Sequence, residues 1–213
     1  MNHVQNGPFY PVKEICIQIK NIFGVDISYN KAWHARRAAI DNVYEDWPSS
    51  IFQLPQYMKE LHMRNPGTAI AWRYYRESGS IKFVFDYVFW AFAPVIQAFQ
   101  HMQPVICVDG THMRGPYKSK MLTAVGINAD NRYLPLAFAL VDKESNESWG
   151  WFMTQLRIYV CPNIYGICII SDIHKGIINT MKSLEQWREP AAYHRYCLVH
   201  VMANFTKKFK SHQ

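Results

Sequence analysis

Apolar residues recur at helical spacing in the first part of the chain. Residues 11–23 carry this pattern and predict an amphipathic helix. The segment GVDISYN interrupts it, and Ser28 is a suitable N-cap for a second, basic helix over residues 29–44. A helix, a short turn and a basic helix can read DNA, although the pattern is more often an ordinary helical hairpin. A third helix is expected from Pro48 to the NPG of residues 65–67.

The pattern then becomes aromatic and partly alternating. Residues 69–92 predict one or two strands around a turn at Gly79, and a short helix is expected after Pro94. We therefore expect a small helical region over residues 1–68, followed by linking strands and a helix over residues 69–103.

From Pro104 onward, short strands alternate with helices. The expected strands are residues 104–109, 120–130, 132–142, 165–171 and 193–200, and the expected helices are residues 145–160, 172–184 and 201–213. The second and third strands form a hairpin with its turn at residues 130–131. This order predicts an α+β (α/β-like) domain over residues 104–213, with a mixed sheet flanked by helices.

The composition is that of a globular protein with a polyanionic partner. Hydrophobic residues make up 49% of the chain and charged residues 18%, which excludes a disordered chain. The formal net charge of +7 favours nucleic acid as a partner, although a mildly basic protein without such a partner has the same charge. The five cysteines, an odd number, indicate reduced thiols. No apolar run reaches the length of a membrane span, so no membrane association is expected.

Two acids carry the predicted chemistry. Asp109 ends one continuous apolar strand and Asp172 directly follows another, and such strands are buried in the centre of a sheet. If the strands are neighbours, the carboxylates repel each other unless a divalent cation lies between them. Mg²⁺ or Mn²⁺ in this place could act on a phosphodiester. The alternative is that Asp172 caps the next helix and that Asp109 supports a turn with Gly110.

Several motifs follow one another in a distinctive order. They are VDGTH at residues 108–112, GPYKSKMLTAVGINADNRYLPLAFALVDKESNESWGWF at residues 115–152, SDIHKGI at residues 171–177 and CLVH at residues 197–200. In this order the chain resembles the plant Mutator-like element (MULE) transposases, over nearly its whole length. It also resembles the related domesticated transposases that regulate plant transcription.

The resemblance implies a ribonuclease H-like fold with an Asp-Asp-Glu triad that binds two divalent metal ions. By motif, Asp109 matches the first acid and Asp172 the second. Cys197 and His200 match a Cys-x-x-His signature that follows the second acid. These two residues could also form half of a zinc site, but structural zinc normally takes four ligands, so Zn²⁺ is not the favoured cofactor.

The third acid of the triad, a Glu on a late helix, lies beyond this pattern. The chain stops at Gln213, and none of Glu147, Glu185 or Glu189 occupies the expected place. We therefore expect a C-terminally incomplete ribonuclease H-like domain that does not transpose DNA alone. Glu147 is expected to cap or pack against its helix rather than to bind metal.

Smaller signals surround the acids. His112 and His174 could touch a phosphate or position a water molecule, or they could simply be exposed. Five basic residues could contact the DNA backbone, or could form a solvated face: Arg114, Lys118, Lys120, Lys207 and Lys208.

The sequence thus predicts a MULE-type DNA transposase with Mg²⁺ or Mn²⁺, DNA as its partner and the nucleus as its location. It leaves open whether the chain forms a homo-oligomer. One alternative is a domesticated, non-catalytic DNA-binding regulator of transcription. The other is a metal-dependent nuclease that uses a Glu within the chain.

Overall fold

The computed structural model describes residues 10–44, 47–76, 79, 83–113 and 119–209. The chain divides into two compact units, residues 1–57 and residues 58–213. Among the described residues, no helix is both long enough and apolar enough to cross a lipid bilayer.

The first helices follow the apolar spacing of the sequence. α1 (Val12–Phe23) ends at Gly24, whose left-handed backbone (φ 66°) closes the last turn. α2 (Tyr29–Tyr44) begins after Ser28, whose hydroxyl accepts a backbone N–H of the first turn at 3.3 Å. α3 (Trp47–Arg64) ends directly before the NPG segment. The three predicted helices are therefore confirmed, whereas DNA reading by α2 stays a prediction.

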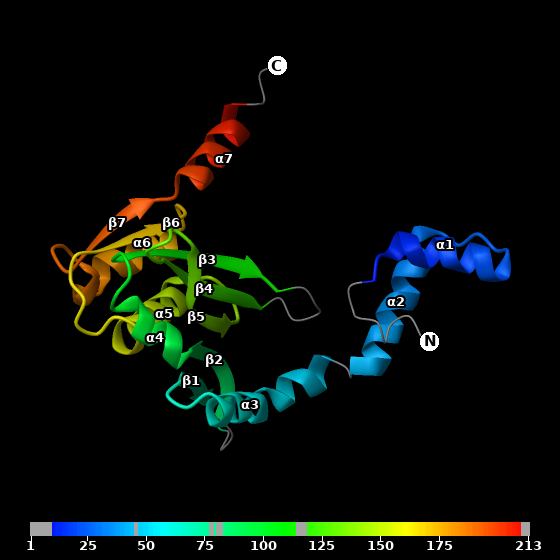
Figure 1. Cartoon of the computed structure of the whole chain (residues 1–213), viewed down its shortest axis with the longest axis horizontal. Helices are drawn as coiled ribbons and strands as arrows, with labels where there is room; N and C mark the ends of the chain where they lie inside the picture. Colours follow the sequence, from blue (N-terminus) through cyan, green and yellow to red (C-terminus); the bar gives the residue numbers. More distant parts are fainter. Residues whose placement is uncertain (1–9, 45–46, 77–78, 80–82, 114–118, 210–213) are drawn as a thin grey trace. The chain divides into compact units, whose positions relative to one another are not determined.

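Seven strands of the described chain form one mixed sheet (Figure 1). They are β1 (Ala69–Arg76), β2 (Phe83–Ala91), β3 (Val105–His112), β4 (Lys120–Ile127), β5 (Tyr133–Val141), β6 (Ile167–Ser171) and β7 (Ala192–Tyr196). Their order across the sheet is β1-β2-β5-β4-β3-β6-β7. The β3-β6 and β6-β7 pairs are parallel and the other four pairs are antiparallel. The predicted α+β class with a mixed sheet is confirmed.

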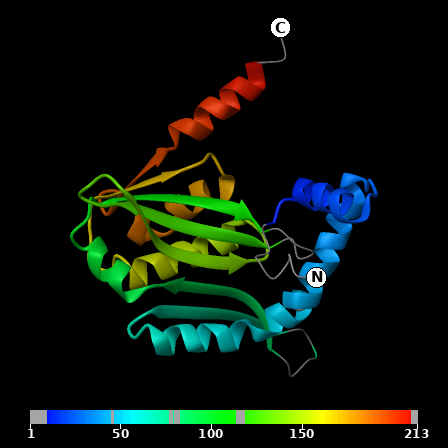
Figure 2. The same ribbon diagram turned by 45° about the vertical axis from the view of Figure 1, so that its right-hand side comes forward.

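Helices connect the strands and cover one face of the sheet. α4 (Ala93–Phe99) joins β2 to β3, and a 3₁₀ helix (Glu185–Trp187) precedes β7. α5 (Asn146–Tyr159) and α6 (Lys175–Ser183) pack against each other on the sheet (Figure 2). The four α5 residues that the pattern assigns to one face are fully buried: Trp149, Phe152, Met153 and Leu156. The core therefore lies between this face of the sheet and α5 and α6.

β3 is longer than the sequence predicts. It does not end at Asp109 but continues to His112, which pairs with Lys120 of β4. The prediction that Asp109 ends the strand is therefore wrong. The alternative that Asp109 supports a turn with Gly110 is also wrong, because Gly110 is itself paired in the ladder. The reason is that β4 supplies a backbone partner for each of these polar residues.

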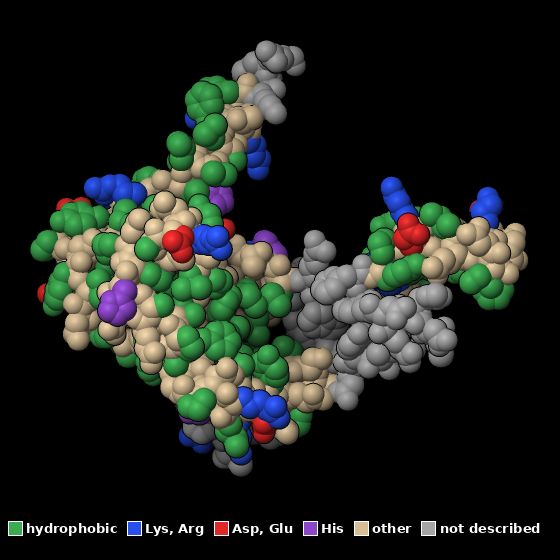
Figure 3. All heavy atoms as spheres, in the orientation of Figure 1, with side chains coloured by type: hydrophobic (Ala, Val, Ile, Leu, Met, Phe, Trp, Pro, Cys, Tyr) green, Lys and Arg blue, Asp and Glu red, His purple; other side chains and the backbone are tan. Residues whose placement is uncertain are grey.

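The last strand and helix also differ from the prediction. β7 ends at Tyr196, and α7 (Leu198–Phe209) begins three residues earlier than expected. His200 therefore lies in the first turn of a helix rather than in a strand. The stretch YHRYCLVH is short, and its order of apolar and polar residues does not reveal where the strand ends and the helix begins. α7 has no buried side chain, and exposed apolar side chains lie along its length (Figure 3).

Candidate active site

The two acids singled out by the sequence lie on one strand and directly after its parallel neighbour: Asp109 is in β3, and Asp172 follows β6. β3 pairs with β6 in the register Val105↔Cys168 and Cys107↔Ile170. Asp109 follows Cys107 by two residues, Asp172 follows Ile170 by two residues, and the charge of Asp172 acts on Asp109, so the two carboxylates are near each other.

The Asp109 carboxyl group has a raised pKa. Its partial burial raises the pKa of the carboxyl group, and the nearby charges of Asp172 and Glu144 raise it further. The Gly110 N–H, which donates to Oδ1 at 2.9 Å, and the His200 side chain act in the opposite direction. The net effect is a raised pKa, so the charged form of Asp109 favours a nearby cation.

Asp172 lies in the short link between β6 and α6. Its Oδ1 accepts the His174 N–H at 3.1 Å. His174, not Asp172, is the N-cap of α6, because its Nδ1 accepts the Gly176 N–H at 3.1 Å. The alternative in which Asp172 serves as the cap of the helix is therefore wrong, and the Asp172 carboxylate bonds within the link instead.

Glu144 is a further acid near Asp109, which the sequence pattern does not predict. It is half-buried in the link between β5 and α5, with its carboxylate against the backbone of Gly110. A Cβ atom on Gly110 would lie 2.6 Å from the Glu144 carboxyl carbon. The signal that locates Glu144 is topological. β3 and β5 are each antiparallel to β4, so they run the same way and end at the same edge of the sheet.

Lys120 is held beside Glu144 and His112. Its Nζ lies 3.0 Å from Oε1 of Glu144 and 2.6 Å from Nε2 of His112. The Lys120 and Glu144 side chains are each only 15% exposed. The structure thus brings together two predicted residues, Lys120 and His112, and Lys120 forms a largely shielded ion pair with Glu144. Contact of Lys120 with DNA stays a prediction.

The Cys-x-x-His signature lies at the start of α7. The charge of His200 lowers the pKa of Asp109, which places this first turn near the acids. The Cys197 N–H donates to the carbonyl of Ser171 at 2.6 Å and so joins α7 to β6. The pKa of Cys107 is raised by burial and then by nearby Cys197. Cys197 and His200 are therefore near the acids.

The donor set matches a hard divalent ion better than zinc. In the described part of the chain, no three His, Cys, Asp or Glu side chains are grouped so that they could hold a metal ion. Structural Zn²⁺ needs four protein ligands, so this arrangement does not fit it. Mg²⁺ is usually held by one or two carboxylates together with water and substrate phosphates. Asp109 and Asp172 fit that requirement.

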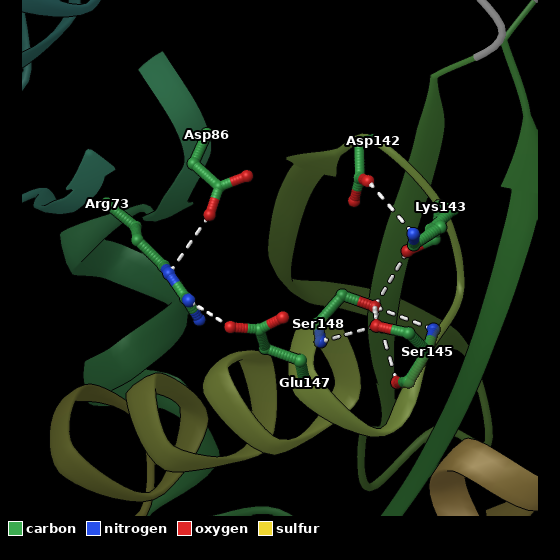
Figure 4. A network of polar contacts seen from close by, with 7 residues as sticks. All are labelled: Arg73, Asp86, Asp142, Lys143, Ser145, Glu147 and Ser148. Carbon is green, nitrogen blue, oxygen red and sulfur yellow. Dashed lines mark hydrogen bonds and ion pairs between the residues drawn. The ribbon is translucent and has the colours of Figure 1, made fainter. Parts of the chain in front are cut away.

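Glu147 belongs to a separate polar network (Figure 4). Its carboxylate pairs with Arg73 of β1, and Arg73 Nε also lies 3.0 Å from Asp86 of β2. Ser145 is the N-cap of α5, because its hydroxyl accepts the Ser148 N–H at 3.1 Å. The network joins the β1-β2 hairpin to the start of α5, so Glu147 has a packing partner far along the chain.

The remaining candidate residues lie apart or outside the described residues. Lys207 and Lys208 are exposed in the last turn of α7. Arg114 and Lys118 fall outside the residues that the structure describes. Their contact with DNA stays a prediction.

Comparison with known proteins agrees with the motif order. No curated protein matches the chain in sequence. The family model described as MULE transposase domain matches residues 105–204. The matched span runs from the start of β3 into α7 and includes both acids and the Cys-x-x-His signature. Residues 105–204 are therefore similar to the MULE transposase domain.

Proposed function

We propose that Asp109 and Asp172 hold Mg²⁺ or Mn²⁺ for the cleavage and strand transfer of DNA. The observation that supports the proposal is the parallel pairing of β3 with β6, together with the effect of the Asp172 charge on Asp109. The raised pKa of Asp109 supports it, because a bound cation would relieve that strain. The transposase domain implies a DNA partner, and the nuclear location that we propose follows from this DNA substrate.

The residues around the acids have separate tasks in this proposal. A bound divalent ion lowers the pKa of water and stabilises negative charge on a phosphodiester. Asp109 would supply ligand oxygens from β3, and Asp172 from the link that follows β6. Lys120 bonds Glu144 and His112, and an ammonium group has a third N–H that can donate to a phosphate oxygen. The exposed Lys207 and Lys208 add contacts to the DNA backbone.

DNA binding with and without Mn²⁺ tests this function. We expect Mn²⁺ to tighten binding, because an ion held by the two carboxylates would attract a phosphate. Asp109→Asn should remove this increment but keep the binding that remains in EDTA. Asp142→Asn is the matched control, since Asp142 is exposed and pairs only weakly with Lys143, at 3.9 Å.

The outcome also separates the proposal from its regulatory alternative. Binding that is the same in Mn²⁺, in EDTA and in Asp109→Asn would contradict metal use. It would support a non-catalytic DNA-binding protein. The expectation that the chain does not transpose DNA alone stays a prediction, and a strand-transfer assay with Mn²⁺ tests it.

One observation favours a second candidate, a nuclease that uses a Glu within the chain. Glu144 lies against Gly110, and its charge is felt by Asp109. This candidate predicts Mn²⁺-dependent nicking of DNA that Glu144→Gln abolishes while the fold is kept. Nicking that survives Glu144→Gln, or no nicking at all, would exclude it.

A further inference from the structure

A hydrogen-bond chain lies behind Asp172, on the side away from Asp109. Ser171, the last residue of β6, is 1% exposed. Its Oγ lies 2.7 Å from the carbonyl oxygen of Asp172 and 2.8 Å from Nε2 of His194. His194 comes from the neighbouring strand β7. Two adjacent strands therefore meet at one buried hydroxyl group.

The direction of each bond follows from the number of protons. A carbonyl oxygen can only accept, so the single hydroxyl proton of Ser171 goes to Asp172. The bond to His194 must then be donated by an Nε2–H. Burial, followed by the charge of Arg195, lowers the pKa of His194, so the neutral ring with its proton on Nε2 is the expected form. His194 therefore orients the hydroxyl group that holds the Asp172 carbonyl.

The backbone at Asp172 is fixed from several sides. The Ser171 carbonyl accepts the Cys197 N–H at 2.6 Å, and the Asp172 Oδ1 accepts the His174 N–H at 3.1 Å. The bond from Ser171 adds a third restraint, at the next carbonyl along the chain. Together these bonds set both the position of the Asp172 backbone and the direction of its carboxylate.

His194 can be reached from outside through a cavity. The cavity has a volume of about 360 Å³ and lies between α6, the 3₁₀ helix and β7. Its lining includes His194, Tyr196 and Trp187. The opposite side of the imidazole, at Ser171, is buried. A substitution of His194 can therefore be accommodated at the cavity without filling the core.

We propose that Ser171 and His194 are positioning residues that fix Asp172 for binding of the divalent ion. This inference rests on the proposed function of Asp109 and Asp172. Groups that orient the ligands of a metal typically change its affinity 10- to 100-fold when they are removed. A hydroxyl group that served only stability would leave the affinity unchanged.

Calorimetric titration of the purified chain with Mn²⁺ tests this role. Ser171→Ala and His194→Met should each weaken Mn²⁺ binding about tenfold. His194→Gln should retain most of the affinity, because its side-chain NH₂ can donate to Ser171 in place of Nε2–H. The matched control is Thr154→Val, which removes a hydroxyl group bonded at 2.8 Å to the Gly150 carbonyl in α5. It should leave Mn²⁺ affinity within about twofold.

Each outcome decides the proposal. Circular dichroism first confirms that a variant is folded, and the comparison of His194→Gln with His194→Met remains decisive if Ser171→Ala does not fold. Unchanged Mn²⁺ affinity in folded Ser171→Ala or His194→Met overturns the positioning role. If Asp172→Asn loses binding in the same experiment, the proposed metal site still stands. A wild-type chain that binds no Mn²⁺ at millimolar concentration overturns both.

Discussion

Asp109 lies in β3 and Asp172 directly follows the neighbouring strand β6, and the surroundings of the two acids differ in kind. Asp109 is surrounded by charges, from Asp172, Glu144 and His200. Asp172 is surrounded by hydrogen bonds, from the His174 N–H to its carboxylate and from the Ser171 hydroxyl to its carbonyl. The sheet sets the distance between the acids, but each neighbourhood controls a different property. We expect charge to decide how strongly Asp109 attracts a cation, and hydrogen bonding to decide where Asp172 points.

The largest expected effect on the free energy of unfolding comes from the charged residues around Asp109. Lys120→Met leaves the Glu144 carboxylate, whose side chain is 15% exposed, without its counter-ion and close to Asp109. We expect a loss of about 3 kcal/mol in the free energy of unfolding, measured by urea denaturation, since breaking a buried pair strands a charge. Glu144→Gln in the same chain should restore much of it.

Lys143→Met is the control for that prediction. Lys143 pairs with Asp142 at 3.9 Å, and both side chains are more than half exposed. Its removal should change the free energy of unfolding by less than about 0.5 kcal/mol. An equal loss in Lys120→Met and Lys143→Met would contradict the claim that the shielded Lys120–Glu144 pair matters more to stability than the exposed Lys143–Asp142 pair.

A smaller loss is expected from Gly110→Ala. The new methyl group would lie 2.6 Å from the Glu144 carboxyl carbon, so this side chain must move and weaken its bond to Lys120. We expect a loss of about 1–2 kcal/mol, again by urea denaturation. Gly150→Ala is the matched control, since its nearest contact is 3.9 Å away, and it should stabilise α5. Equal effects of the two substitutions would contradict the packing of Glu144 on Gly110.

The smallest expected effect is on the melting temperature of Asp109→Asn, which should be stabilising and should depend on pH. The folded-state pKa of Asp109 is raised by burial and by its acidic neighbours. Its stabilising contribution is therefore full below the unfolded pKa, which is about 4, and is lost as pH rises through the folded pKa. Asp109→Asn cannot ionise and avoids this loss. In EDTA the variant should melt slightly above wild type at pH 7 and at the same temperature near pH 3. A variant that melts below wild type at pH 7 would contradict a strained Asp109.

The sequence predicts features that depend on local pattern or on neighbouring strands. The apolar spacing of α5 identifies its buried residues, and the two apolar strands single out Asp109 and Asp172, although only the structure shows that these strands are neighbours. Features that depend on pairing across the sheet are not predictable in this way. The polar stretch after Asp109 extends β3 only because β4 pairs with it. Glu144 reaches Gly110 only because β5 runs parallel to β3, with β4 between them.

The hydrogen-bond chain behind Asp172 is invisible in the sequence for a similar reason. Ser171 reads as the last residue of a strand, and His194 as one histidine in a short alternating segment. They meet because β6 and β7 are adjacent and parallel, in the register Ser171↔Tyr196. The proton directions then follow from chemistry alone.

The affinity of the chain for Mn²⁺, followed by electron paramagnetic resonance, decides whether a metal site lies between β3 and β6. Wild type, Asp109→Asn and Asp172→Asn are compared, with Asp142→Asn as the control. The account predicts saturable Mn²⁺ binding by the wild type and the control, and at least tenfold weaker binding by each of the other two variants. Equal Mn²⁺ binding by all four proteins would contradict a metal site between β3 and β6.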